Sequence, residues 1–459
     1  MIEDTAAAPP QTHQPFLYEL EQRPPLWRNL IYGIQWALIM FPALVVVAAV
    51  AARALGLSPQ EEVDFFQKIL LLSGALTVCQ TLLGHGYPLQ EGPATALLLT
   101  FVTLAPCGLP AIQGGVLCGG VLLLALGRLR LMRYLTPYFT ANVVGVILML
   151  IGFTLLPHLI PLMLGIDAAH PAGEGSVFAL AIALVLAVAV LSHWLRGFWQ
   201  STAMILGIAL GTTVFFFWGR LDFNLFREAS WFSLPESLWM GLPAFDISAV
   251  ITCILAYMAV IVNSVGSIHG VGEVVGTRGM ARRVENGIAF TGVGGIVAAA
   301  FGVVGTVSYS ASPGVILVTR VASKYAQTMC GVVLLIAAFV PRLNALLAAI
   351  PATVVGAVLC VALASQVGAG ITAVTAGERS LEGRDYLVVG LPVMLGTVVA
   401  AAPSEFFAGL PRTLQLLVSN GLVLGIILVL LLEHLLLRQR PRQGDPASRQ
   451  NSGQDSSGG

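Results

Sequence analysis

Two strips of the sequence carry the residues whose types and spacing are suited to binding a ligand. Residues 86–95 place Glu91 and Pro93 among glycines, residues 308–314 place Pro313 among serines, and a short apolar run follows each strip. A helix that begins after such a strip has N–H groups without intrahelical partners and the positive end of its dipole at its start. These groups suit a carbonyl or an anionic group. The strips therefore predict a site that binds through backbone and small polar groups.

The elements that position these strips must be membrane helices, because the chain is too apolar for a soluble domain. Of its 459 residues, 57% are hydrophobic and 10% are charged, and the mean hydropathy is +0.86. Soluble domains carry about 25% charged residues. Apolar stretches of about 18 residues or more recur along the chain, and each can cross a bilayer. We expect an all-α polytopic membrane protein, and the net charge of zero indicates no nucleic acid partner.

The apolar runs and their breaks predict about fourteen transmembrane segments. They lie near residues 30–53, 65–84, 88–106, 110–128, 138–164, 176–195, 199–218, 246–268, 287–307, 309–324, 327–349, 351–371, 386–406 and 413–437. The two strips break the third and tenth segments, and Pro93 and Pro313 lie 220 residues apart. Paired discontinuous segments in matching halves are typical of a transporter's binding site. The alternative is that both prolines merely kink ordinary helices.

Lysine and arginine predict the orientation of the chain. If the N-terminus is cytoplasmic, the inner segments hold 17 of the 23 basic residues and the outer segments hold 6. Such an excess is typical of cytoplasmic loops. We therefore expect both termini in the cytoplasm and an even number of spans. Residues 1–29 and 438–459 are expected to be cytoplasmic tails, and the second is rich in Ser, Gly and Gln, which favours disorder.

Glu91 is the notable carboxylate inside a broken segment. Burying an uncompensated carboxylate costs several kcal/mol, so an intramembrane acid is a functional candidate by default. We expect Glu91 to be the residue that couples transport to an ion. The alternative is that Glu91 lies near the water interface, where the strip begins. The six cysteines show neither metal-ligand spacing nor a disulfide framework, and we expect no metal and no cofactor.

Residues 309–324 resemble the signature of the nucleobase–ascorbate transporters, also called the nucleobase:cation symporter type 2 or uracil/xanthine permease family. Gly314, Thr319 and Arg320 fit that signature. Residues 34–41 and 88–96 are similar to the family's first and third segments. The resemblance covers nearly the whole chain, from about residue 25 to residue 437.

The resemblance implies fourteen spans in two inverted repeats of seven, with a core domain and a gate domain. In this family the broken third and tenth segments form short antiparallel strands that meet at the substrate, and a homodimer moves its substrate by an elevator-like motion. We therefore assign residues 30–218 to the first repeat (spans 1–7) and 246–437 to the second (spans 8–14), with 219–245 as an outer connection. We expect a bacterial inner membrane protein.

The family's substrate-facing positions, carried over to this sequence, include no acidic or basic side chain. They are Ala43, Thr95, Asn263, Tyr309, Ala311 and Ser312, with Gly314 beside them. Asn263 stands where the family has an acidic residue, and Ala311 and Ser312 stand where it has an acidic or amide residue and an Asn. An amide pairs with a nucleobase edge but does not titrate. The usual route of proton coupling is therefore in question.

The sequence as a whole predicts a secondary active transporter for a nucleobase such as uracil or xanthine. A proton or a sodium ion is the expected coupled ion. One alternative is an anion carrier of the sulfate or bicarbonate type, which uses the same fold. Another is a non-transporting membrane sensor. An enzyme is not expected, because the predicted spans hold no cluster of acidic and histidine side chains.

Overall fold

The computed structural model describes most of the chain. The described residues are 16–166, 170–195, 203–221, 224–236, 238–239, 241–276, 279–375, 381–407 and 409–438. The expected C-terminal tail lies outside them, apart from its first residue.

The first half of the chain contains ten described helices and one strand, with two short 3-10 turns. They are α1 (Leu26–Ala54), α2 (Pro59–Leu82), β1 (Glu91–Pro93), α3 (Thr95–Leu104), η1 (Ala105–Cys107), α4 (Leu109–Arg128), α5 (Met132–Leu135), η2 (Thr136–Tyr138), α6 (Ala141–Thr154), α7 (Leu156–Leu164), α8 (Gly175–Trp194), α10 (Ala203–Phe217) and α11 (Asn224–Glu228).

The second half runs through a similar series. Its described elements are α12 (Ile247–Val275), α13 (Met280–Phe301), β2 (Thr306–Ser308), α14 (Ser312–Thr319), α15 (Lys324–Ala338), α16 (Pro341–Ala348), α17 (Ala352–Thr375), α18 (Gly383–Ala401), η3 (Ser404–Phe407), α19 (Arg412–Ser419), α20 (Gly421–Leu431) and the π-helical turn η4 (Leu432–Leu436). Each half therefore has two long helices, a three-residue strand, a short helix and a further helix in the same order.

Local signals in the sequence set the ends of the long helices. Ser58 caps α2 in a capping box with Glu61, and a proline follows at the first helical position. The carboxylate of Asp246 accepts hydrogen bonds from two N–H groups at the start of α12. That helix ends at Gly276, whose left-handed conformation (φ 67°) suits glycine.

The predicted class is confirmed, whereas the count of spans is not. Nine described helical segments are long and apolar enough to cross a membrane, counting α6 and α7 as one, and α15 with α16, bent by 87°, adds a tenth. Shorter apolar helices occupy residues 95–107, 203–217 and 421–436. The number of fourteen therefore stays a prediction. The breaks in the third and tenth segments are present, with β1 before α3 and β2 before α14.

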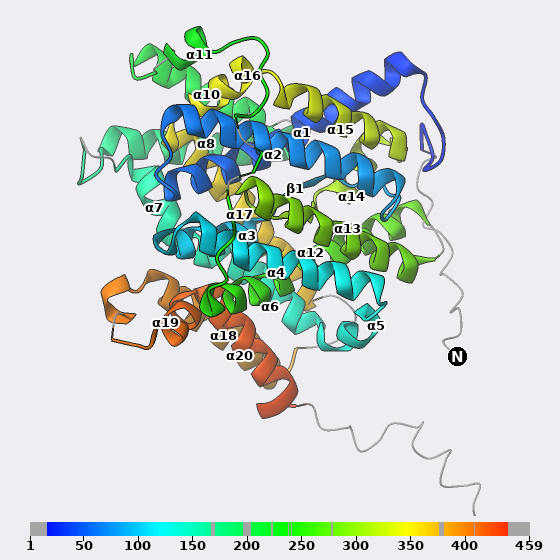
Figure 1. Cartoon of the computed structure of the whole chain (residues 1–459), viewed down its shortest axis with the longest axis vertical. Coiled ribbons are helices and arrows are strands. Elements are labelled where there is room, and N and C mark those ends of the chain that lie inside the picture. Colours follow the sequence, from blue (N-terminus) through cyan, green and yellow to red (C-terminus); the bar gives the residue numbers. More distant parts are fainter. Residues whose placement is uncertain are drawn as a thin grey trace, which may run out of the picture.

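The helices pack into two groups. In one group α4 packs against α13 and α12, and α2 packs against α15 and α1. In the other, α6 packs against α17, α18 and α20, while α8 packs against α10 and α17. Figure 1 shows α18 and α20 together at one end of the molecule, away from α1, α2 and α15. The two groups meet where α1 contacts α17 and α12 contacts α6, and the assignment of a core and a gate domain stays a prediction.

The strand pair lies near the middle of the molecule (Figure 1). It is antiparallel, and its register pairs Glu91 with Ser308, Gly92 with Val307 and Pro93 with Thr306. Flanking bonds extend it: the N–H of Ala94 donates to the Gly305 carbonyl (2.8 Å), and that of Tyr309 donates to the Gln90 carbonyl (2.9 Å). Equivalent strands that run in opposite directions are the arrangement that inverted repeats require.

The N-terminal segment differs from the expected tail. Residues 16–25 lie against the end of α14, where the N–H of Leu17 donates to the carbonyl of Arg320 (2.8 Å). The ammonium of Lys324 lies 2.7 Å from the carboxylate of Glu21. α1 also begins inside the expected tail. The segment therefore lies beside the end of the tenth segment, and the orientation of both in the membrane stays a prediction.

Glycines bring the backbones of α4 and α13 into direct contact. A Cβ atom on Gly292 would lie 2.3 Å from the backbone nitrogen of Leu124 and 2.7 Å from the carbonyl oxygen of Gly120. Backbone atoms cannot move aside as a flexible side chain does. Small residues at this crossing are therefore required for the close approach of two membrane helices.

Replacing Gly292 by valine tests this packing. We expect Gly292→Val to destabilise the protein by about 1–3 kcal/mol, because overpacking forces the two helices apart. The measurement is the midpoint of thermal unfolding in detergent, followed by size-exclusion chromatography. Gly390→Ala in α18 is the matched control, because no atom lies within 4 Å of a Cβ at that position. A Gly292→Val protein as stable as this control would show that the contact is not tight.

Candidate functional site

The strand pair presents two different faces. In an antiparallel pair, hydrogen-bonded positions alternate with positions whose side chains lie closer together. The bonds at Ala94 and Gln90 place Pro93 at a non-hydrogen-bonded position, so its missing N–H costs no ladder bond. Glu91 falls on the same face as Pro93, whereas Val307 lies on the other face and lines a cavity. One face thus looks into the cavity and the other into the protein interior.

The helices that follow the strands begin at the cavity. α3 follows Ala94 and α14 follows Ala311, and neither helix has a side-chain cap. Their first N–H groups therefore have no partner within the helix. Pro313 lies in the first turn of α14, as expected, whereas Pro93 ends β1 and precedes the cap of α3. Both helix starts can offer N–H groups and dipole ends to a ligand.

A cavity of about 540 Å³ lies between the two helix groups. One wall comes from α1, the start of α3, α12 and the segment from β2 to α14, and the opposite wall comes mainly from α17 with α6, α8 and α10. Its volume is in the range of sites for small organic molecules, and its walls are mostly apolar with few polar groups. The lining residues described here include no Asp, Glu, Lys, Arg or His.

Six of the sequence-predicted site residues line this cavity. They are Ala43, Thr95, Asn263, Tyr309, Ala311 and Gly314. They come from α1, α3, α12 and the β2–α14 segment, so the fold joins residues that are far apart in the sequence. Whether each contacts a substrate stays a prediction.

Four other predicted residues lie outside the cavity lining. Ser312 is fully buried beneath the start of α14. The hydroxyl of Thr319 donates to the Val315 carbonyl (2.8 Å) within that helix. Arg320 ends the helix in a left-handed conformation (φ 59°) and binds the N-terminal segment through its carbonyl. Glu91 is buried on the interior face of the strand pair, so it lies neither in the cavity nor at a water interface.

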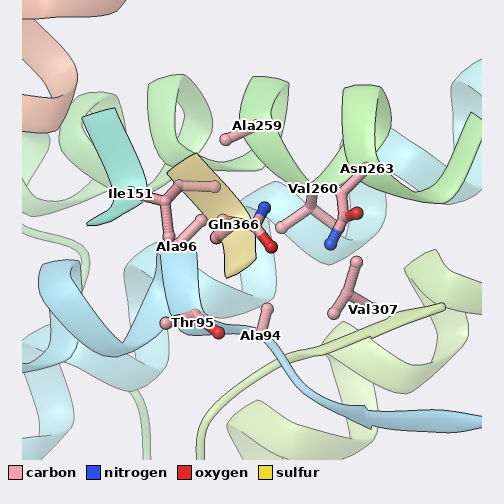
Figure 2. A pocket seen from close by; sticks show the side chains of 9 residues that line it. All are labelled: Ala94, Thr95, Ala96, Ile151, Ala259, Val260, Asn263, Val307 and Gln366. Atoms are coloured by element: carbon pink, nitrogen blue, oxygen red, sulfur yellow. The ribbon is translucent and has the colours of Figure 1, made fainter. Parts of the chain in front are cut away.

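Gln366 is a site residue that sequence reasoning missed. It lies on α17, in the wall opposite Asn263, and Figure 2 shows both carboxamides reaching inward, with Val260 between them. Neither side-chain amide hydrogen-bonds to another side chain or backbone group among the described residues. The available signal was a glutamine inside a long apolar segment, since a polar residue there usually faces a cavity or a partner helix.

A small recess opens beside the main cavity between these two amides. Its volume is about 20 Å³, which is enough for one water-sized group. The recess and the cavity share Thr95, Ile151, Asn263, Val307 and Gln366. Ala94 and Ala96 at the start of α3, with Ala259 and Val260 on α12, complete it (Figure 2). The recess therefore suits a single oxygen atom or amino group that two amides and a helix N-terminus can contact.

A helical membrane bundle with two paired half-helices around one central cavity has the architecture of a permease. Residues 28–405 match the model Xan_ur_permease, described as "Permease family". The chain therefore belongs to this family, as the signature at residues 309–324 predicted. It is a membrane transporter and not an enzyme.

Relatives of similar length support this assignment. The chain is 27% identical over 429 residues to the nucleobase transporter PlUacP of Paenibacillus larvae, and the match covers 91% of this chain and 96% of that protein. It is 25% identical over 423 residues to the uric acid permease PucK of Bacillus subtilis, with 91% and 97% covered. It is also 25% identical over 442 residues to the xanthine permease XanP of Escherichia coli, with 91% and 93% covered.

Solved structures share the fold. The transmembrane domain of the cyanobacterial bicarbonate transporter BicA superposes with a TM-score of 0.59 at 19% identity, covering 82% of this chain and 97% of that one. The murine anion transporter Slc26a9 in its inward-facing state gives a TM-score of 0.58 at 12% identity, with 89% and 68% covered. At these identities the likeness concerns the fold alone.

Gly92 provides a test of the cavity's shape. A Cβ atom on Gly92 would lie 2.3 Å from the hydroxyl oxygen of Tyr309, so Gly92→Ala must displace this cavity-lining ring. We expect uptake of the labelled substrate to fall by about tenfold, since losing about 1.4 kcal/mol of binding has that effect. Gly266→Ala is the control, because its Cβ would meet no atom within 4 Å. Equal uptake by both variants would contradict a binding role for this part of the cavity.

Proposed function

We propose that this permease carries a nucleobase of the purine-dione type, such as xanthine or uric acid, across the membrane together with a cation. The observation that carries the proposal is the pair of free amides, Asn263 and Gln366, on opposite walls of a neutral cavity. A carboxamide offers both a donor and an acceptor. It therefore complements the alternating N–H and C=O groups of a lactam ring.

The shape of the site supports the same ligand class. The recess of about 20 Å³ between the amides suits one exocyclic oxygen, while the rings would lie in the larger cavity against apolar walls. The N-terminus of α3 faces that oxygen with N–H groups and a positive dipole end. Tyr309 supplies an aromatic surface in the same cavity. Relatives that are named for nucleobases, uric acid and xanthine fit this class.

An inorganic anion fits the site less well. The cavity is mostly apolar, and the described residues that line it include no basic side chain to balance an anionic charge. A sulfate or bicarbonate ion would fill little of a space of about 540 Å³. The resemblance to anion transporters concerns the fold, and the relatives by sequence carry names of nucleobase permeases.

The two walls of the cavity belong to different helix groups, which suits an elevator-like movement of core against gate. In such a movement the strand pair, α3, α12 and α14 would travel with the substrate past α17. We place the protein in a bacterial inner membrane with both termini in the cytoplasm, as the charge bias favours. α8 and α18 are the least buried of the long helices, and they would face lipid or a second copy in a homodimer.

An uptake panel tests the substrate class. Purified protein in liposomes would be loaded with unlabelled compound and challenged with labelled xanthine, uric acid, uracil and sulfate. We expect exchange of xanthine or uric acid, competition by related purines and no exchange of sulfate. Sulfate exchange without purine exchange would replace this function by that of an anion carrier.

The two amides provide a sharper test. We expect Asn263→Ala and Gln366→Ala each to weaken purine binding by about tenfold, since one hydrogen bond contributes about 0.5–1.5 kcal/mol and 1.4 kcal/mol is tenfold. The measurement is the concentration of xanthine that halves labelled uptake. Thr372→Ala is the control, because Thr372 lies exposed on α17 and bonds only within its helix. Unchanged half-inhibition in both amide variants would remove these residues from the site.

A further inference from the structure

A buried polar cluster lies behind the strand pair, on the face turned away from the cavity. Its centre is the carboxyl group of Glu91, which is 0% exposed. One carboxyl oxygen accepts a hydrogen bond from the hydroxyl of Ser308 on the opposite strand and lies 3.6 Å from Nε2 of His85. The other oxygen has no hydrogen-bond partner among the described residues. Buried polar atoms are normally hydrogen-bonded, so this unpartnered oxygen calls for an explanation other than packing.

His85 lies beside Glu91, and its Nε2 has no hydrogen-bond partner among the described residues. Its ring is fully buried, and Nδ1 accepts a hydrogen bond from the backbone N–H of Tyr87 (3.0 Å). A ring nitrogen that accepts carries no proton, so the proton of neutral His85 lies on Nε2, on the side of Glu91. A second proton on the ring would break the bond to Tyr87. Glu91, unlike His85, can therefore bind a proton while the hydrogen bond between Tyr87 and His85 stays in place.

The neighbouring elements bring no lysine or arginine side chain to Glu91 among the described residues. From α2, the hydroxyl of Thr77 pairs with the backbone N–H of Glu91 (3.1 Å), and the buried residues of α1 include no titratable group. After β2, the phenol hydroxyl of Tyr309 donates to the Pro93 carbonyl (3.4 Å). The cation of Arg283 on α13 is directed to the carbonyl oxygen of His85 (2.7 Å). No lysine or arginine among the described residues forms an ion pair with Glu91.

We propose that Glu91 is the proton-binding site that couples transport to a proton gradient, with Ser308 as the donor that stabilises its ionised form and His85 as the polar group nearest to the same oxygen. The ligand is a proton rather than a metal cation. Ser308 donates its hydroxyl proton to one carboxyl oxygen, and His85 Nε2 lies 3.6 Å from the same oxygen, so a cation there would meet donor groups rather than further oxygen ligands. This inference rests on the proposed transport of a nucleobase, but it places the coupling ion outside the substrate cavity.

The strand pair links the proton site to the cavity. When Glu91 is ionised, its bond to Ser308 is charge-assisted and holds β1 to β2, and protonation reduces it to an ordinary bond. The opposite face of the same strands carries Val307, which lines the cavity, and each strand leads into a half-helix. The protonation state therefore changes how firmly the two half-helices are joined at the substrate site.

The proposal is tested with the full chain in liposomes by two assays on one preparation. The first is exchange of labelled for unlabelled xanthine at equal pH on both sides, which needs no net proton movement. The second is accumulation of xanthine driven by acid outside, where one coupled proton gives up to about tenfold accumulation per pH unit. We expect Glu91→Gln to continue exchange and to lose accumulation, because the amide keeps the size but cannot titrate.

Two further variants complete this experiment. Glu273→Gln changes an exposed glutamate on α12 and should leave both assays unchanged. His85→Gln keeps a neutral donor and should shift the pH at which accumulation is half-maximal, which gives a second readout if Glu91→Gln fails to fold. Accumulation by Glu91→Gln equal to that of the natural protein would overturn the proposal. Accumulation that follows a sodium gradient and ignores the pH gradient would also overturn it.

An infrared titration separates this proposal from the proposed substrate. A protonated buried carboxyl group gives a C=O stretching band distinct from that of a carboxylate. We expect such a band to titrate in the natural protein without any substrate and to be absent from Glu91→Gln. If the natural protein exchanges no nucleobase, the substrate assignment falls while this band still supports the proton site. If the natural protein shows no titrating C=O band of this kind, the proposed proton site is wrong, whatever the protein transports.

Discussion

The pairing of β1 with β2 is the interaction on which the rest of the site depends. Within a bilayer, backbone N–H and C=O groups must be paired inside the protein. Two segments broken at matching points satisfy each other over three residues, with flanking bonds at Ala94 and Tyr309. The pairing permits two helices to start in the middle of the protein and brings their N-termini to one cavity.

The two faces of the strand pair separate two kinds of chemistry. The face with Val307 borders a neutral cavity, whose polar side chains are the amides of Asn263 on α12 and Gln366 on α17 and a few hydroxyls. The interior face carries Glu91 with Ser308 and His85. Residue 263 is an amide where the family resemblance implies an acid, and Glu91 is an acid within the neighbouring strand pair. On the proposed mechanism, substrate and proton bind on opposite faces of one small element.

Much of this site followed from local sequence signals. Proline and glycine before short apolar runs identified both broken segments, and the family signature identified Tyr309 and Gly314 as cavity residues. Two other features of the site were not predicted correctly from the sequence. Gln366 was missed because α17 is apolar over most of its surface, so its hydrophobic pattern does not indicate which side faces a cavity. Ser312 was placed in the site by the same signature, yet the first turn of α14 directs it into the interior.

The sequence by itself determined the class of protein, the two breaks and the presence of an acid in the first break, since hydropathy, proline and glycine act within a few residues of chain. The tertiary structure alone decided the register that joins Glu91 to Ser308, the approach of His85 and the meeting of Asn263 with Gln366. These contacts join residues that are distant along the chain, and they depend on how whole helices pack. A one-residue shift of β1 would turn Glu91 towards the cavity, and no local signal specifies that register.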